Sequence, residues 1–229
     1  INTGMYRNGI EEKELEACIY RALERKLNIC GFFTHHKSAD ELGNDFFIQK
    51  ETFKRIKLQI SNTCEKLNLS NFQLHSCNSA ALFRLKNLDE DFARVGIAAY
   101  GYHENHPSLN NPDLKPVLSL YANRISSRIL PKNKTVGYGG KFRTNEDQHI
   151  STYDIGYADG FHRIPDSLTY QIDDSLQVVG RVSMDNLSVN SNKDEICLFN
   201  DAKALAKLHK TISYEMLTSL KSHIVRKIV

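Results

Sequence analysis

The sequence contains no apolar run that approaches the roughly 20 residues of a membrane-spanning helix. It also contains no C-x-x-C pair, and its five cysteines are scattered along the chain. Scattered thiols in odd number favour a reduced, cytoplasmic protein over a disulfide framework, and they argue against a metal cluster. We therefore expect no membrane association and no metal site.

A strong excess of charge of one sign is missing too. The chain has 30 basic and 27 acidic residues, for a net charge of +3. This balance weakly favours acidic ligands and gives no case for nucleic acid as a partner. Hydrophobic residues make up 41% of the 229 residues, which is enough for a buried core in one or two domains.

The first half of the chain alternates helical and strand patterns. Apolar spacing predicts helices over 11–28 and 50–67 and from Ser79 onward, and short apolar runs predict strands over 31–34, 72–75 and 95–100. Such alternation is typical of βαβ units in a parallel sheet. These units are too few to close an eight-stranded barrel, which takes about 250 residues. We therefore expect further strands N-terminal to this segment.

The second half has a different character. Residues 103–115 are rich in His, Asn, Pro and Ser and indicate a linker. Beyond it, short strand-like runs are separated by turns, at 117–125, 150–155, 176–182, 186–189 and 195–199. Helices are predicted over 201–209, with Asp201 as cap, and over 213–220. We predict two domains, a partial α/β barrel over 1–112 and a β-rich domain over 113–229.

Several short motifs could carry chemistry. They are Thr3-Gly4-Met5-Tyr6-Arg7-Asn8-Gly9, Asn78-Ser79, Arg94-Val95-Gly96-Ile97-Ala98-Ala99-Tyr100-Gly101, Gly156-Tyr157-Ala158-Asp159-Gly160, Ser183-Met184-Asp185 and Ser213-Tyr214-Glu215. Taken singly, most have an ordinary structural explanation: Ser79 is a helix cap, Arg94 forms a salt bridge and Tyr214 is a packed aromatic. Tyr157, held between two glycines in a turn, is a candidate acid/base.

Taken together and in this order, the motifs resemble the alanine racemase family, whose enzymes use pyridoxal 5′-phosphate (PLP). The resemblance implies the C-terminal part of a TIM-type (β/α)8 barrel that binds PLP, followed by a mostly β domain. It covers the whole chain but only the later part of such an enzyme, because the segment with the PLP lysine is missing. We expect this segment alone to be inactive.

The resemblance also implies which residues contact the cofactor. The phosphate group would be bound by residues from both halves of the chain: Asn78, Ser79, Gly96, Ile97 and Tyr214. Arg94 would donate to the pyridine nitrogen. Because arginine keeps its proton near neutral pH, that nitrogen must accept, which weakens the cofactor as an electron sink and discourages side reactions.

Racemisation requires a base on each face of the substrate Cα. In the family these bases are the PLP lysine and a tyrosine that matches Tyr157, and a histidine that matches His35 contacts this tyrosine. A one-residue error in the match would give the role to His36. A phenol needs a hydrogen-bonded, positive environment to act near neutrality.

Three more residues would bind the substrate. Arg7 matches the arginine that holds the substrate carboxylate, a pairing that suits its bidentate guanidinium. In many members a carbamylated lysine supports it, and we expect such a lysine immediately before Ile1. Met184 and Asp185 match a loop that reaches the site of the other subunit, as does Tyr157. A homodimer with shared active sites is therefore implied.

The implied reaction is the interconversion of L- and D-alanine, which supplies D-alanine for peptidoglycan. Other interpretations stay open: a broad-specificity amino-acid racemase, a decarboxylase of related fold, a non-catalytic PLP-binding protein, or a truncated product with a structural role. Decarboxylases of this shape lack the combined Gly-Tyr-Ala-Asp-Gly and Thr-Gly-Met-x-Arg motifs, and PLP carriers lack a β domain.

Overall fold

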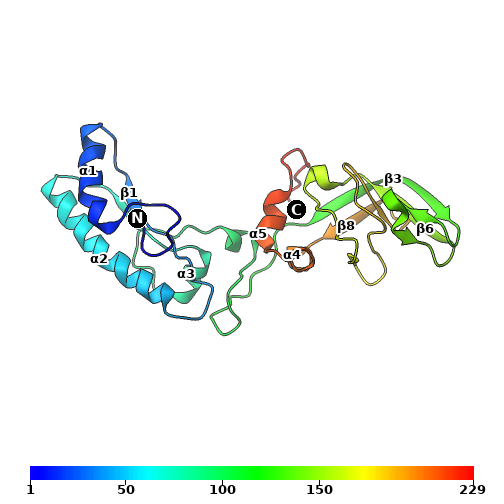
Figure 1. Ribbon diagram of the computed structural model, residues 1–229, viewed down its shortest axis with the longest axis horizontal. Coiled ribbons are helices and arrows are strands. Elements are labelled where there is room, and N and C mark those ends of the chain that lie inside the picture. Colours follow the sequence, from blue (N-terminus) through cyan, green and yellow to red (C-terminus); the bar gives the residue numbers. More distant parts are fainter. The chain divides into compact units, whose positions relative to one another are not determined.

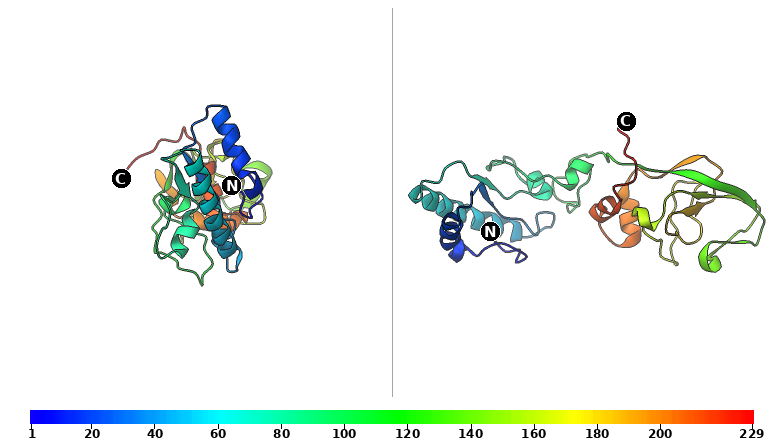
Figure 2. Two further views of the ribbon diagram at one scale, coloured as in Figure 1. Left: turned by 90° about the vertical axis from the view of Figure 1, so that its left-hand side faces the viewer. Right: turned by 90° about the horizontal axis from the view of Figure 1, so that it is seen from above.

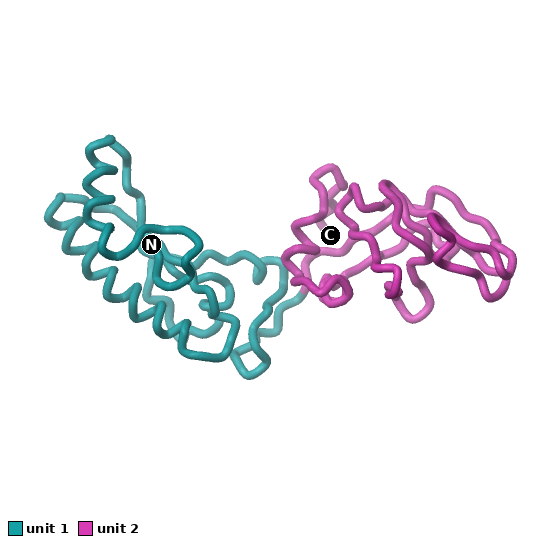
Figure 3. Tube along the Cα trace, viewed as in Figure 1, with its two compact units in different colours: residues 1–115 teal, residues 116–229 magenta.

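The computed structural model describes all residues, 1–229. The chain divides into two compact units, Ile1–Lys115 and Pro116–Val229 (Figure 3). The boundary predicted from the sequence lies at 112/113, inside the segment from 103 to 115, which contains no helix or strand. No helix has the length and apolar character that crossing a membrane requires.

The first unit is built around two parallel strands and the helix that connects them. Its elements are η1 (Glu12–Glu14), α1 (Leu15–Glu24), β1 (Gly31–Phe33), α2 (Asp45–Lys66), β2 (Gln73–His75), α3 (Ser79–Arg84) and η2 (Ile97–Tyr100) (Figure 1). β1 pairs with β2 in parallel, with Phe32 opposite Leu74. The predicted βαβ arrangement is therefore present for this pair of strands.

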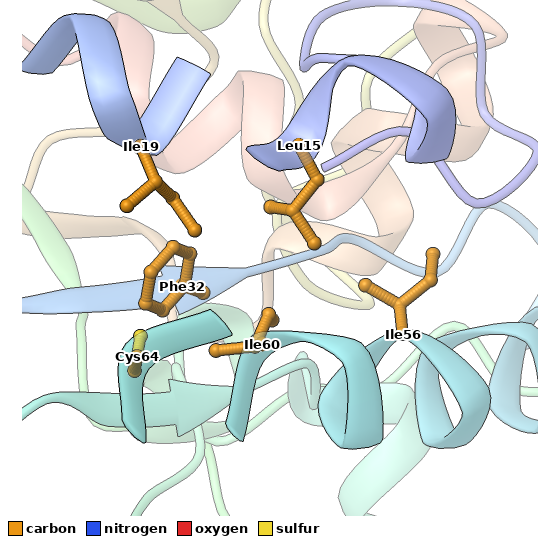
Figure 4. Packing of buried hydrophobic residues seen from close by; sticks show 6 residues of the cluster. All are labelled: Leu15, Ile19, Phe32, Ile56, Ile60 and Cys64. Carbon is orange, nitrogen blue, oxygen red and sulfur yellow. The ribbon is translucent and has the colours of Figure 1, made fainter. Parts of the chain in front are cut away.

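The core of the first unit lies between α1, β1 and α2. Its buried side chains face one another in Figure 4: Leu15, Ile19, Phe32, Ile56, Ile60 and Cys64. The spacing of Ile56, Ile60 and Cys64 places them on one face of α2, as the helical periodicity predicts. This packing fixes the strand ends from which the candidate site residues project.

Element boundaries differ from the prediction at both helices. α1 ends at Glu24 rather than near Asn28, because Lys26 adopts a left-handed backbone (φ 57°) that stops the helix. α2 begins at Asp45, five residues before the predicted start, and its first turn buries Phe46.

One predicted strand of this unit is wrong. Residues 95–100 were predicted as extended, but Ile97–Tyr100 form the 3₁₀ helix η2. Gly96 has φ −106° and ψ −92°, which breaks an extended path, and the amide of Ala99 donates to the Gly96 carbonyl at 3.0 Å. A short apolar run is compatible with strand or helix, and the glycine decides here.

The second unit contains a four-stranded antiparallel sheet in the order β7-β6-β3-β8. Its elements are β3 (Leu120–Leu130), β4 (Thr135–Val136), η3 (Tyr138–Gly140), β5 (Phe142–Arg143), β6 (Gln148–Tyr153), η4 (Tyr157–Asp159), β7 (Leu187–Val189), β8 (Glu195–Phe199), α4 (Ala202–His209) and α5 (Ser213–Ser219). β3 is the long green strand in Figure 2. Asp201 caps α4, as predicted, by accepting from the Lys203 amide at 2.8 Å.

The strand predicted over 176–182 is wrong. The segment makes only isolated bridges, Gln171 to Gln177 and Val178 to Val189. Its apolar side chains are buried all the same, including Val179 and Val182. Gly180 then turns the chain with φ +72°, and the alternating pattern records burial without a hydrogen-bonded ladder.

Candidate functional site

Arg94 lies at the C-terminal ends of both strands of the first unit. Its Nη2 atom donates to the carbonyl of Thr34, which follows β1, at 2.8 Å, and to that of Ser76, which follows β2, at 3.2 Å. The guanidinium carbon lies 5.1 Å from the centre of the Phe33 ring. A cation is thus fixed at the edge where barrel enzymes of this strand arrangement carry their active sites.

Two histidines accept from this guanidinium. Nδ1 of His35 lies 3.2 Å from Nη2 of Arg94, and Nδ1 of His75 contacts Nη1. Since arginine only donates, both histidines must accept at Nδ1 and carry their proton at Nε2. Burial lowers the pKa of His35, and the charges of Arg94 and Arg7 lower it further. His75 was not identified from the sequence; its position at the end of β2 was the available signal.

His36 faces elsewhere. Its ring is buried, Nε2 lies 3.1 Å from the Ser76 hydroxyl, and it lines a small pocket beside α2 together with Lys50 and Glu90. Burial, followed by the charges of His35, Arg94 and Lys50, lowers the pKa of His36 to about 4. Of the two adjacent histidines, it is His35 that contacts Arg94.

Asn78, Ser79, Gly96 and Ile97 come together at the start of α3. The Asn78 side chain caps α3 by accepting from the Ala81 amide at 2.9 Å. The Ser79 hydroxyl accepts from the Gly96 amide at 3.0 Å and lies 3.5 Å from the Ala98 amide. A Cβ added to Gly96 would meet nothing within 4 Å, so the backbone there is open to a ligand. Ile97 itself is buried below.

Arg7 lies on an exposed loop that is stabilised by hydrogen bonds to the Asn2 side chain. The Asn2 side chain accepts from the amides of Gly4 and Tyr6, and Tyr6 adopts a positive φ of 55°. The Arg7 side chain is exposed, and its charge reaches His35, whose pKa it helps to lower. This loop therefore presents a cation on the side of the unit where His35 and Arg94 lie.

In the second unit, Tyr157 and the Met184-Asp185 turn lie against each other. The Tyr157 amide donates to the Ser183 carbonyl at 3.0 Å, and the Ala158 amide donates to the Met184 carbonyl at 2.7 Å. The side chains of Tyr157 and Met184 remain exposed, at 43% and 60%. The Asp185 carboxylate accepts from Asn186 at 2.8 Å. The structure thus joins residues almost thirty positions apart in one exposed patch.

Tyr214 lies in the first turn of α5. Its neighbour Ser213 is buried, whereas the Tyr214 ring is 39% exposed. Its carbonyl accepts from the Thr218 hydroxyl at 2.8 Å. Near the C-terminus, Arg226 folds back to donate to the Lys221 carbonyl at 3.1 Å.

Comparison with known proteins gives consistent matches over the full chain. The family model "Alanine racemase, N-terminal domain" matches residues 1–104, and "Alanine racemase, C-terminal domain" matches 117–228. The alanine racemase of a Nitratiruptor species is 45% identical over 99% of this chain and 66% of its own length. That of Campylobacter curvus is 41% identical over the whole chain and 67% of its own length.

Solved structures agree. The alanine racemase from Bacillus anthracis with bound L-Ala-P has a TM-score of 0.79 at 28% identity and covers 96% of this chain and 60% of that protein. The enzyme of Clostridium difficile 630 has a TM-score of 0.83 at 27% identity and covers 98% of this chain and 62% of that protein. The chain spans about two thirds of the length of the relatives that it matches.

Proposed function

Because the chain belongs to the alanine racemase family, we propose that the complete polypeptide carrying it interconverts L- and D-alanine with PLP as cofactor. The observation that carries the proposal is the cation Arg94 at two strand ends, two residues before Gly96, whose amide donates to the Ser79 hydroxyl. The L-Ala-P bound to the Bacillus anthracis enzyme supports alanine as the substrate.

The residues of the first unit fit the cofactor. A phosphate group needs donors in one place. The Ser79 hydroxyl accepts from the Gly96 amide and can donate its own proton to a phosphate, and the space above the glycine is open. Arg94 supplies a permanent donor for the ring nitrogen. PLP, when bound, supplies the electron sink that acidifies the substrate Cα–H. In the proposal, Asn78 orders α3 beneath the phosphate, Ile97 offers its amide and Tyr214 adds a hydroxyl.

Tyr157 moves the proton on one face of Cα in this mechanism. Its phenol is exposed, and the backbone of the turn that carries it is held by hydrogen bonds to Ser183 and Met184. A fixed backbone therefore presents the hydroxyl to a ligand. His35 carries its remaining N–H at Nε2, because Nδ1 accepts from Arg94. In the proposal, that Nε2–H donates to the phenolate form of Tyr157 and stabilises it.

Arg7 binds the substrate carboxylate and Met184 and Asp185 close the site over it. Tyr157, Met184 and Asp185 serve the site of a second subunit, so that the proposed unit of function is a homodimer with shared active sites. A lysine of the remaining polypeptide acts as the second base. All five cysteines are unpaired, which supports a reducing, cytoplasmic location, where D-alanine would be made for peptidoglycan.

The test is a chiral assay of the complete polypeptide. With PLP present, it should show a visible absorbance band and convert L-alanine to D-alanine until both are equal. Amine products from lysine, ornithine or arginine are measured in parallel. A coloured enzyme that decarboxylates these amino acids and leaves alanine unchanged would overturn the proposal in favour of a decarboxylase.

A further inference from the structure

We propose that Asp159 and His223 form a clamp that positions Tyr157 for proton transfer. The inference rests on the proposed function of Tyr157 and adds two residues to it that none of the motif roles includes. Asp159 belongs to the same turn as Tyr157, whereas His223 lies 64 residues further along, after the last helix.

The Asp159 carboxylate connects two segments of the chain. Oδ2 accepts from the Gly156 amide at 2.7 Å, immediately before Tyr157. Oδ1 lies 2.8 Å from Nε2 of His223. The Asp159 side chain is only 16% exposed, while His223 is 64% exposed. One half-enclosed carboxylate thus fixes the entry of the turn and holds the C-terminal segment beside it.

Backbone contacts bring the C-terminal segment directly onto the turn. The Lys221 amide donates to the Asp159 carbonyl at 3.0 Å, and the Ser219 hydroxyl donates to the Gly160 carbonyl at 3.0 Å. A Cβ on Gly160 would overlap the Ser219 carbonyl oxygen. The segment 219–223 therefore packs against the turn.

The segment 183–185 also contacts the turn. Tyr157 and Ala158 donate their amides to the carbonyls of Ser183 and Met184, and a Cβ on Gly156 would overlap the latter. Both segments thus contact the backbone of the turn, and Tyr157 itself remains exposed. Because misplacement of a reacting group by about 1 Å can cost about 100-fold in rate, the Asp159 contacts bear directly on turnover.

Asp159 and His223 are positioning residues, since they act through the backbone of Tyr157. Replacing Asp159 with alanine removes both contacts of the carboxylate. In the complete enzyme, Asp159→Ala should lower kcat about 10- to 100-fold, with a KM for alanine and a cofactor absorbance band close to those of the wild type. His223→Ala should lower kcat by a smaller factor, and His223→Gln, which keeps an N–H donor, should restore most of it.

The decisive experiment is a double-mutant cycle with Tyr157→Phe. If Asp159 acts only through Tyr157, Asp159→Ala should slow the wild type but add no loss to the Tyr157→Phe enzyme. Asp173→Ala is the matched control, because Asp173 also caps a turn of this unit, through Ser175 and Leu176, but contacts nothing in 156–160. This control should keep the wild-type rate.

The outcomes distinguish a failure of the clamp from a failure of the proposed function. If the wild type racemises alanine but Asp159→Ala and His223→Ala keep its kcat, or if the losses multiply in the double variant, the clamp is wrong. If the wild type does not racemise alanine at all, the proposed function itself fails. Should Asp159→Ala not fold, the exposed His223 and its glutamine variant carry the same comparison.

Discussion

At the scale of single residues, the hydrogen bonds that Arg94 donates determine the protonation of its neighbours. A guanidinium that donates to two strand-end carbonyls and two histidine Nδ1 atoms fixes the protonation pattern around it. The sequence could supply the arginine through its motif. It did not show that His75 joins the group, because a place at the end of a predicted strand does not by itself specify a contact with Arg94.

Because His36 is buried and neutral, we expect the folded chain to lose stability at acid pH. Its pKa in the folded chain is about 4, whereas an unfolded histidine titrates near 6.5. Between these pH values only the unfolded chain takes up the proton. The contribution of neutral His36 to the free energy of unfolding is therefore complete above about pH 6.5 and declines toward pH 4. The loss amounts to at most about 3 kcal/mol.

Urea unfolding at pH 7.5 and pH 5 measures this effect. In His36→Gln, which can still donate to Ser76, the free energy of unfolding should fall less between the two pH values than in the wild type. His149→Gln, at an exposed position of β6, is the control and should behave as the wild type. An unchanged pH dependence in His36→Gln would show that His36 does not contribute.

Replacing Ser79 should weaken the binding of PLP without slowing the catalytic step. Ser79→Ala removes a hydroxyl that contacts the Gly96 amide and, in the proposal, the phosphate. We expect the Kd for PLP to rise about 10-fold, as for one hydrogen bond to a charged group, while kcat at saturating PLP changes little. Absorbance titration of the apoenzyme measures it. Ser70→Ala, at an exposed position after α2, should leave the Kd unchanged.

At the scale of elements, the sequence predicted best where the apolar spacing is regular, and a cap helped at α4. α2, α4 and α5 and the β1–β2 pair follow from spacing and from Asp201. The failures at 95–100 and 176–182 share a cause. In both, an apolar run lacks regular strand pairing, and a glycine, Gly96 or Gly180, redirects the backbone. The segment 176–182 is largely buried, whereas Ile97 is the buried residue of 95–100. An apolar run therefore does not by itself specify strand pairing, which long-range contacts decide.

The turn around Tyr157 predicts a difference between two glycines of the second unit. Gly160 (φ +95°) touches the Ser219 backbone, whereas the nearest atom to a Cβ on Gly139 (φ +71°, ψ 7°) is 3.3 Å away and belongs to the end of the Arg181 side chain. Gly139→Ala should cost about 1 kcal/mol of left-handed backbone strain. Gly160→Ala should cost more than about 2 kcal/mol, because rigid backbone must also move. Thermal unfolding of both variants compares them, and equal losses would contradict the contact.

At the scale of the whole molecule, the candidate residues fall into two sets, one in each compact unit. Arg7, His35, Ser79 and Arg94 lie in the first, and Tyr157 with Met184 and Asp185 in the second. The order of the motifs predicts both sets, but no local pattern shows how they combine. The contact between Asp159 and His223 could not be predicted from a local pattern either, since the two residues are 64 positions apart.

The proposed sharing of active sites between two subunits predicts complementation between inactive variants. Arg7→Ala and Tyr157→Phe homodimers should each be inactive, whereas a mixed dimer should recover about half of the wild-type activity, because one of its two sites then contains neither defect. Co-expression with two affinity tags isolates the mixed dimer for the chiral assay. Absence of recovery in a purified mixed dimer would show that Tyr157 serves its own subunit.

The central claim, that Tyr157 is one of two bases for alanine racemisation, is tested most directly by following the Cα proton in D₂O. The wild-type enzyme should racemise both enantiomers and exchange their Cα protons. Tyr157→Phe should keep the cofactor band and lose racemisation by about 100-fold or more in both directions, since the enantiomers have equal free energy. It should still exchange the proton of one enantiomer, the one facing the remaining base. Racemisation within a few-fold of the wild type would contradict the claim.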